Sequence, residues 1–299
     1  MEVGRFAPSP SGRMHLGNVF AALLAWLSVR SAGGEMVLRM EDLDRDRCTA
    51  EYEAALRDDL RWLGLDWDRE TRPQRLGTAD YEAVLEQLGD RVYPCWCSRS
   101  ALNVVNAPHA ADGHVIYPGT CRDLTPAQRA ARTRPPALRL KVPAETIRFT
   151  DGVYGSCEEN LAEACGDFVL RRADGVFAYQ LAVVADDIAA GMTQVVRGRD
   201  LLSSTPRQIY LYRLLGQTPP RYFHVPLLVA PDGRRLSKRE RDQAMDRLRQ
   251  ETTAPALIGR LAHAAGLLDR AEPITARELA AVFSWERVRP TDIVIEAHT

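Results

Sequence analysis

The sequence predicts an α/β protein built on a parallel sheet. A strand at 4–8, a helix from His15 or Asn18 to the glycine pair at 33–34, and a strand at 36–40 form a right-handed strand–helix–strand unit. Strand and helix patterns alternate again between residues 168 and 229. The chain has 299 residues, of which 45% are hydrophobic and 26% charged. These proportions are typical of a globular protein with one large or two modest domains.

The composition argues against membrane proteins and against proteins that coat nucleic acid. The most apolar run, residues 19–29, has about half the length that a membrane span needs. The N-terminus has no basic region leading into a long apolar one, so no secretory signal is expected and we place the protein in the cytoplasm. The net charge of -1 argues against non-specific coating of nucleic acid, but it is compatible with a local basic face.

The N-terminal elements are predicted from spacing and capping residues. In the first helix the apolar positions recur at three and four, and the paired glycines end it. Thr49 is expected to cap the next helix, which has Glu51 and Glu53 in its first turn. Thr78 is expected to cap a third helix that ends near Leu88. The second strand is followed by a cluster of carboxylates, Glu41, Asp42, Asp44 and Asp46.

From Tyr93 to about Ile147 the periodicity fades, and cysteines, prolines and arginines become frequent. We interpret this region as an insertion and divide the chain into units at 1–92, 93–167, 168–240 and 241–299. After the insertion we expect a hairpin at 168–179, a helix at 181–187, a strand at 193–197, a helix at 206–215, a strand at 224–229, a basic loop at 234–241 and a helical tail from 254.

The loop between the first strand and the first helix has the features of a phosphate site. The helix opens with His15, Leu16, Gly17 and Asn18. A helix N-terminus offers free N–H groups and the positive end of the helix dipole. Gly17 allows the backbone to approach a ligand, and His15 can hydrogen-bond to phosphate oxygens. The alternative is an ordinary loop with a helix-capping histidine.

A second candidate is the basic loop around Lys238. The chain has 39 basic residues, and only Lys141 and Lys238 are lysines. A lysine on such a loop can close over a triphosphate and stabilise the charge that develops during displacement. The alternative is a solvated basic surface loop.

These two motifs, taken together, resemble the HIGH-type and KMSKS-type motifs of the class I aminoacyl-tRNA synthetases. Three further segments, residues 5–12, 38–44 and 196–210, resemble the glutamyl/glutaminyl branch of that family. The resemblance implies a Rossmann-type, HIGH-family nucleotide-binding domain with an inserted subdomain. It implies that glutamate attacks the α-phosphorus of ATP, that glutamyl-adenylate forms, and that RNA then accepts the glutamyl group. Two departures are Asn18, at the last position of the first motif, and Arg239, which we assign no catalytic role.

The resemblance also implies roles for individual residues. His15 and Lys238 are the expected catalytic residues, and Arg5 and Arg197 are expected to hold the substrate carboxylate through the guanidinium fork. Glu41 is expected to bind the α-ammonium group. The remaining glutamate-pocket residues are Phe6, Ala7, Pro8, Ser9 and Tyr179. The ATP-site residues are Pro8, His15, Gly17, Asn18, Leu236, Ser237 and Lys238. Magnesium is expected with ATP, without an assigned ligand.

Length favours one group within the branch. About sixty residues follow Lys238, fewer than the anticodon-binding domain of ordinary glutamyl synthetases requires. The chain therefore resembles the short members, the glutamyl-queuosine tRNA(Asp) synthetases, which attach glutamate to queuosine at the first anticodon position of tRNA(Asp). Val183 stands where ordinary glutamyl synthetases usually have an asparagine, and valine cannot hydrogen-bond to glutamate. We expect a monomer without a membrane partner.

Cysteines in the insertion predict one structural zinc ion. Cys95, Cys97 and Cys121 provide three thiolates, and a fourth ligand would complete a tetrahedral site. Chemistry alone allows His109 or His114 as the fourth ligand, whereas the spacing in the short paralogues favours Tyr117. Reduced buried cysteines are the alternative. The other cysteines, Cys48, Cys157 and Cys165, are interpreted as structural.

Two other functions remain open. The first is a truncated glutamyl synthetase that charges tRNA(Glu). The second is a zinc-stabilised RNA-binding module without catalysis, which the presence of Arg5, Glu41, Arg197 and Lys238 argues against. A run of basic residues in the insertion either contacts RNA phosphates or forms a solvated face. Its members are Arg129, Arg132, Arg134, Arg139, Lys141 and Arg148.

Overall fold

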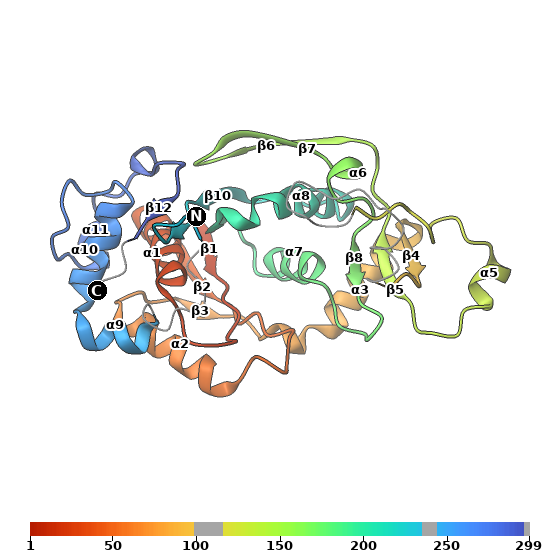
Figure 1. Ribbon diagram of the computed structural model, residues 1–299, viewed down its shortest axis with the longest axis horizontal. Coiled ribbons are helices and arrows are strands. Elements are labelled where there is room, and N and C mark those ends of the chain that lie inside the picture. Colours follow the sequence, from red (N-terminus) through yellow and green to blue (C-terminus); the bar gives the residue numbers. More distant parts are fainter. Residues whose placement is uncertain (99–115, 235–243, 296–299) are drawn as a thin grey trace.

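A computed structural model describes residues 1–98, 116–234 and 244–295 (Figure 1). The predicted strand–helix–strand unit is confirmed. Strand β1 (Val3–Phe6) and strand β2 (Glu35–Leu38) pair in parallel, and helix α1 (Leu16–Ser31) connects them. A short strand, β3 (Arg69–Glu70), extends this sheet beyond β2. Gly4 allows α1 to pack tightly on β1, because a Cβ atom there would lie 2.4 Å from Val29 Cγ2.

A second sheet continues the first. Its strand order is β7-β6-β10-β9, with β10 (Arg221–Val225) parallel to β9 (Gln194–Gly198). Strand β9 lies beside β1, where the Thr193 backbone N–H donates to the carbonyl of Val3 at 2.9 Å. The carboxyl ends of β1, β2, β9 and β10 therefore meet at one edge, which is where ligands bind in open parallel sheets.

A third, antiparallel sheet has the order β4-β5-β8. It comprises β4 (Val92–Cys95), β5 (Ala137–Leu140) and β8 (Val169–Arg171), and it lies at the α5 end of the molecule in Figure 1. By contrast, β6 (Thr146–Asp151) and β7 (Gly155–Asn160) form a hairpin on β10. The four-unit division of the chain stays a prediction, and these strand pairings cross its boundaries.

The remaining helices and short elements lie between these strands or after them in the chain. The helices are α2 (Ala50–Trp62), α3 (Thr78–Leu88), α5 (Pro126–Ala130), α6 (Leu161–Ala164), α7 (Tyr179–Ala189), α8 (Thr205–Leu214), α9 (Met245–Glu251), α10 (Ala254–Ala264) and α11 (Ala276–Ala280). The 3₁₀ helices are η1 (Gln74–Leu76), η2 (Gly89–Arg91), η3 (Arg199–Ser204) and η5 (Trp285–Arg287). Among the described residues, none of these helices has the length and apolarity needed to cross a bilayer.

Several local predictions need correction. Thr49 caps α2 as predicted, with its side chain accepting from the Tyr52 N–H. Thr78 does not cap α3, because the turn of η1 ends at Gly77 and makes Thr78 the first helical residue. The hairpin turn at 173–175 is present, but its second strand is a single bridge at Phe177 and α7 follows at once.

The tail is helical as predicted, but the last element of its described part is a strand. Strand β12 (Ile293–Val294) pairs in parallel with β11 (Leu228–Val229). A bidentate ion pair between Arg199 and Asp292 anchors this strand, and Asp292 also accepts from the backbone of Leu227 at 3.0 Å. The predicted strand at 224–229 is therefore divided between β10 and β11.

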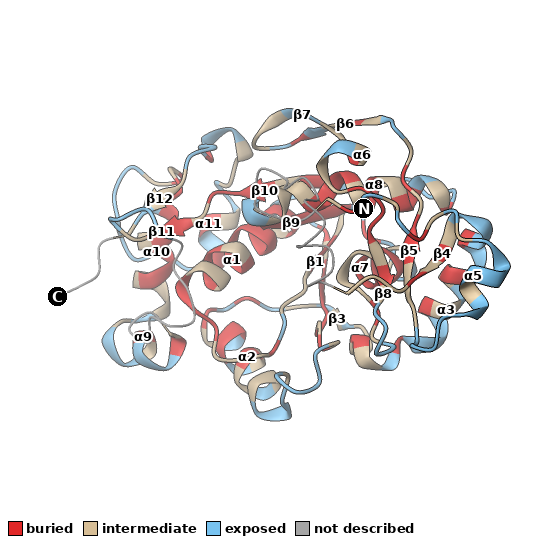
Figure 2. Cartoon of the chain, turned by 45° about the vertical axis from the view of Figure 1, so that its right-hand side comes forward, coloured by how far each residue is buried: buried red, intermediate tan, exposed pale blue. Residues whose placement is uncertain are grey.

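Within the described residues, two large apolar clusters form most of the core. One surrounds α1, which Figure 2 shows buried along most of its length, and includes residues of β1, β2, α2 and α10. The other surrounds α7 and includes residues of α3, α8 and β8. Four charged side chains at the carboxyl-end edge of the sheet are buried, namely Arg5, Arg39, Asp187 and Arg197.

Candidate active site

The structure brings four of the predicted glutamate-site residues together at the carboxyl-end edge. Arg5 comes from β1, Glu41 follows β2, Tyr179 begins α7 and Arg197 lies near the end of β9. The Arg197 guanidinium donates to the Tyr179 hydroxyl at 3.3 Å. Burial raises the pKa of Tyr179, and the charges of Arg197, Glu41 and Arg5 also act on this hydroxyl.

Sequence reasoning missed two charged residues that hold this site together. Arg39 donates to Asp187 at 2.5 Å and to Glu41 at 3.1 Å, and Arg5 donates to the same Asp187 oxygen at 3.3 Å. Burial by itself raises the pKa of Asp187, but the two arginines hold it below its usual range. The signal in the sequence was a charged residue within an apolar run, in Leu38-Arg39-Met40 and again in α7.

Glu41 is a carboxylate suited to an incoming cation. Burial raises the pKa of this carboxyl, even though Arg39 and Arg5 act in the opposite direction. Its ion pair is with Arg39, which is shared with Asp187. A positively charged group bound beside Glu41 would favour the ionised carboxylate.

Arg197 is a buried cation whose hydrogen-bond partners, among the residues that the structure describes, are all uncharged. Its Nε atom donates to His224 at 3.0 Å, one terminal nitrogen donates to Gln208 at 2.8 Å and to Tyr179, and the other donates to Thr205 at 2.7 Å and to the carbonyl of Leu201 at 3.4 Å. Within the described part of the chain, Arg197 forms no ion pair with a carboxylate. Its longest bonds, to Tyr179 and Leu201, are the ones that a ligand carboxylate would most easily replace or share.

His15 caps the first helix, which is the alternative that the sequence left open, and its role in phosphate binding stays a prediction. Its Nδ1 accepts from the Gly17 N–H at 3.1 Å, and the Asn18 side chain accepts from the His15 N–H at 3.2 Å. A Cβ atom at Gly17 would lie 3.1 Å from the His15 ring, so glycine permits this cap. Ala244 forms a bridge with His15, so the residue six positions after Lys238 lies beside the start of the first helix.

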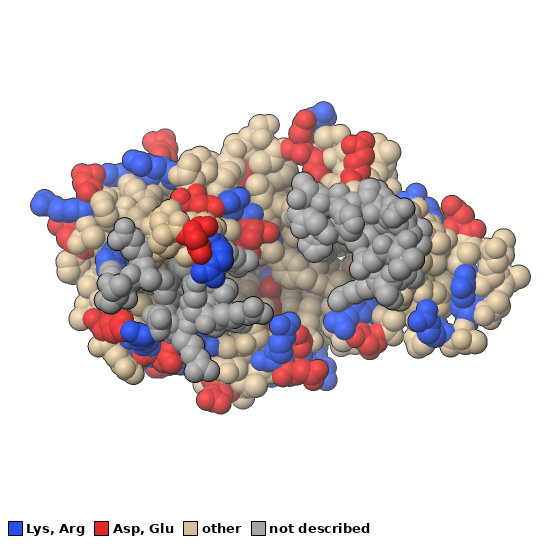
Figure 3. All heavy atoms as spheres, in the orientation of Figure 1, with Lys and Arg blue, Asp and Glu red and all other residues tan. Residues whose placement is uncertain are grey.

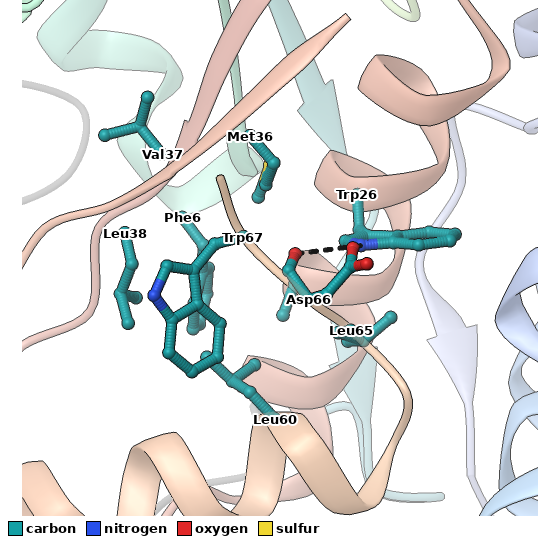
Figure 4. A pocket seen from close by; sticks show the side chains of 10 residues that line it. Phe6, Trp26, Met36, Val37, Leu38, Leu60, Leu65, Asp66 and Trp67 are labelled. Atoms are coloured by element: carbon teal, nitrogen blue, oxygen red, sulfur yellow. Dashed lines mark hydrogen bonds between the residues drawn. The ribbon is translucent and has the colours of Figure 1, made fainter. Parts of the chain in front are cut away.

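The predicted site residues in and after β1 differ from one another in their contacts and in their burial. The Pro8 carbonyl accepts from the Glu41 N–H at 2.9 Å, whereas Ser9 is exposed. The side chain of Phe6 faces away from the site, because alternate residues of a strand point to opposite faces. Figure 4 shows it in an apolar hollow with Leu38, Leu60 and other side chains. Ala7 is half-buried, and Leu236, Ser237 and Lys238 lie outside the described residues.

The three predicted zinc thiols form a cluster. The Sγ atoms of Cys95, Cys97 and Cys121 lie within 4.8 Å of one another, and Cys97 and Cys121 are 3.7 Å apart. The Tyr117 hydroxyl lies 3.3 Å from Cys95 Sγ and 3.9 Å from Cys97 Sγ. Tetrahedral coordination with Zn–S bonds of about 2.3 Å puts sulfurs about 3.8 Å apart. The cluster fits a metal of this size, while His109 and His114 lie outside the described residues.

The basic residues of the insertion differ in burial and in their partners. Arg139 is buried, donates to Cys95 Sγ at 3.2 Å and lies over the Tyr117 ring at 3.8 Å, so it is part of the thiol cluster. Arg148 pairs with Glu158 across the β6–β7 hairpin. Arg132 and Arg134 are exposed. The face shown in Figure 3 has basic and acidic side chains interspersed, in agreement with the near-zero net charge.

The comparisons with known proteins agree with this geometry. Residues 3–290 match the family model of the "tRNA synthetases class I (E and Q), catalytic domain". A protein of Nitratidesulfovibrio vulgaris named glutamyl-Q tRNA(Asp) synthetase is 47% identical over 98% of this chain and 95% of its own length. A protein of Symbiobacterium thermophilum with the same name is 46% identical over the whole chain and 97% of its own length. The chain belongs to the glutamyl-Q tRNA(Asp) synthetase family.

A solved structure places this family member among the class I synthetases. A glutamate tRNA ligase from Elizabethkingia meningosepticum was determined in complex with its amino acid. Its sequence is 26% identical to this chain, and its structure superposes on this chain with a TM-score of 0.85. The alignment covers 99% of this chain and 67% of that ligase. The predicted α/β class is thus confirmed, and this glutamyl-Q tRNA(Asp) synthetase family member is an ATP-dependent aminoacyl ligase.

Proposed function

We propose that the protein activates glutamate and transfers it to queuosine in the anticodon of tRNA(Asp). The α-carboxylate of glutamate attacks the α-phosphorus of ATP, and pyrophosphate leaves with the electron pair of the broken P–O bond. A queuosine hydroxyl then attacks the glutamyl carbonyl, and AMP leaves. The observation that carries the proposal is Arg197, a buried guanidinium whose partners within the described residues are uncharged, and which contacts the Tyr179 hydroxyl near the half-buried Glu41.

Glutamate is held by its three charged groups. Arg197 and Arg5 provide guanidinium groups that match carboxylates in a two-bond fork. Glu41 accepts the α-ammonium group, whose charge favours the ionised form of this carboxyl. The Tyr179 hydroxyl, which accepts from Arg197, closes the same pocket. The enzyme then accelerates activation by positioning the substrates and stabilising charge, without forming a covalent bond to either substrate.

ATP binds where the two motif regions meet. His15, Gly17 and Asn18 form the start of α1, whose positive dipole end attracts the phosphates. Ala244, which follows the segment that carries Lys238, bridges to His15 at this helix start. Lys238 supplies positive charge to the leaving pyrophosphate. Magnesium enters with ATP.

A zinc ion stabilises the insertion. Cys95, Cys97 and Cys121 provide three thiolates, and the Tyr117 hydroxyl is the nearest fourth ligand. Burial, and after it the charge of the Cys95 sulfur, raises the pKa of the Cys97 thiol to about 11. Zinc therefore has to displace protons, and its binding weakens as the pH falls. The ion is structural, because the apolar cluster around these residues is small.

Replacing the thiols tests the zinc site. Cys97→Ser is expected to yield protein without stoichiometric zinc and with a lower melting temperature, because one tetrahedral ligand is lost. Tyr117→Phe keeps the ring but removes the hydroxyl, and it is expected to weaken zinc binding by about 10- to 100-fold. Metal analysis and thermal melts measure both effects, and Cys157→Ser on β7 is the matched control. Wild-type protein that contains no zinc contradicts the proposal.

The activation step is tested by glutamate-dependent exchange of labelled pyrophosphate into ATP. We expect exchange with glutamate, and none with glutamine or aspartate. An absence of exchange under all conditions would favour the RNA-binding module without catalysis. A truncated glutamyl synthetase would also exchange, and the transfer assay that closes the Discussion separates it. Cytoplasmic location, a monomeric state and RNA contacts of the basic run stay predictions.

A further inference from the structure

A buried aspartate–histidine pair lies directly behind Arg197. Asp151, at the end of β6, contacts His224 of β10 with its Oδ2 atom 2.6 Å from the ring Nδ1. The side chains of both residues are 0% exposed. In the parallel register of β10 and β9, His224 is the residue opposite Arg197, and its Nε2 is 3.0 Å from Arg197 Nε.

The chemistry of the partners fixes the protons of this pair. An ionised carboxylate only accepts hydrogen bonds, so Nδ1 of His224 carries the proton that Asp151 receives. Arginine only donates, so Nε2 of His224 must be unprotonated to accept from Arg197. The Thr205 hydroxyl accepts from Arg197 at 2.7 Å and lies 3.2 Å from the same Nε2, to which it donates its own proton. Only the neutral Nδ1–H tautomer satisfies all these bonds.

This arrangement also solves an electrostatic problem. A buried guanidinium needs a compensating negative charge, but a carboxylate in direct contact would compete with the substrate for Arg197. Here the Asp151 charge acts through the imidazole ring, one hydrogen bond further away. Arg197 is therefore stabilised and oriented, and its terminal nitrogens still have no ion pair within the described part of the chain.

We propose that Asp151 and His224 are positioning residues that orient Arg197 for the glutamate carboxylate by keeping His224 Nε2 unprotonated. The inference rests on the proposed function, in which Arg197 binds glutamate. Neither residue touches the substrate. Their effect is on the affinity for glutamate and not on the binding of ATP.

Asp151→Asn gives the sharpest test, because it reverses the tautomer without changing the shape of the side chain. Asp151 Oδ1 accepts from the backbone N–H groups of Val153 and Tyr154, both at 3.0 Å. The asparagine oxygen will stay there, and its NH₂ group will face Nδ1 of His224. The ring proton then moves to Nε2, and two donors meet where Arg197 had an acceptor.

The readout is the KM for glutamate in pyrophosphate exchange. We expect Asp151→Asn to raise it by about 10- to 100-fold, the value of a hydrogen bond to a charged group, with the KM for ATP unchanged. His224→Leu, which offers no acceptor, should behave similarly. His224→Gln, whose side-chain oxygen can replace Nε2, should recover much of the affinity. Asp174→Asn, in the exposed turn at 173–175, is the matched control and should leave both KM values unchanged.

The pH profile provides a second readout. The charged and titratable groups that face the His224 ring are Asp151, Arg197 and Asp200, and the Tyr222 ring stacks on it at 6.2 Å. Burial is the main reason why the pKa of His224 lies below its usual value, although Asp151 opposes this effect. The ring is therefore neutral at and above pH 7, and the KM for glutamate should be constant there. It should rise as the pH falls through this lowered pKa, since the protonated ring repels Arg197.

In Asp151→Asn the rise of the glutamate KM at acidic pH should move to lower pH, because the carboxylate that raised the pKa of His224 is gone. An unchanged glutamate KM in both Asp151→Asn and His224→Leu, with normal exchange by the wild-type protein, overturns the inference. Equal losses of melting temperature and of both substrate affinities also overturn it, since they show a purely structural role. Failure of the wild-type protein to exchange with glutamate contradicts the proposed function instead.

Discussion

Arg197→Ala is expected to lower kcat/KM for glutamate in pyrophosphate exchange by about 30- to 3,000-fold. The substitution removes one partner of a buried charge pair with the substrate, a loss of about 2–5 kcal/mol at 1.4 kcal/mol for each tenfold. The KM for ATP should be unaffected, because the helix start at His15 is built independently of Arg197. Arg197→Lys keeps the charge but loses the two-bond fork, and it should recover only part of the activity.

The matched control for Arg197 is Arg172→Ala. Arg172 is exposed and pairs with Asp174 in the turn at 173–175, away from the site. The variant should have wild-type values of kcat and KM. If Arg197→Ala retains the wild-type kcat/KM for glutamate, Arg197 does not bind the substrate and the proposed site is wrong.

Lys238→Ala is expected to lower kcat for activation by about 100- to 1,000-fold, the loss that follows removal of one group stabilising transition-state charge. The KM for glutamate should change little, because the glutamate site is formed by β1, β2, α7 and β9. The chain offers a matched control, Lys141→Ala, at its other lysine. Lys141 lies at the end of β5, where its carbonyl accepts from the Tyr210 hydroxyl.

The test of Lys238 is single-turnover formation of glutamyl-adenylate, which isolates the chemical step from product release. Lys238→Arg keeps the positive charge, and it should be more active than Lys238→Ala. If Lys238→Ala forms adenylate at the wild-type rate, the basic loop is a solvated surface loop, as the alternative reading of the sequence allows.

Patterns close together in the sequence predicted the local structure well. The apolar spacing and the glycine pair located α1, and Thr49 located the start of α2. The cysteines at 95, 97 and 121 were expected together, and their sulfurs do form a cluster. In each case the determining residues lie within a few turns of chain or carry a distinctive chemistry.

Long-range pairing was harder to predict. Asp187 joins Arg5 and Arg39 from positions 182 and 148 residues away, and nothing local distinguishes this aspartate from Asp186. No element was predicted for the β6–β7 hairpin, which pairs with β10, a strand about 70 residues further along the chain. The two-residue strand β12 is formed only because β11 and the Arg199–Asp292 ion pair hold it.

The central claim is that glutamate is transferred to queuosine in tRNA(Asp). The most direct measurement is transfer of labelled glutamate, with ATP, to purified tRNA(Asp) that carries queuosine. Unmodified tRNA(Asp) and tRNA(Glu) are the parallel substrates. We predict label only on the queuosine-containing tRNA(Asp), with Arg197→Ala as the control of strongly reduced activity. Label on tRNA(Glu), and none on queuosine-containing tRNA(Asp), would contradict the proposal and identify a synthetase that charges tRNA(Glu).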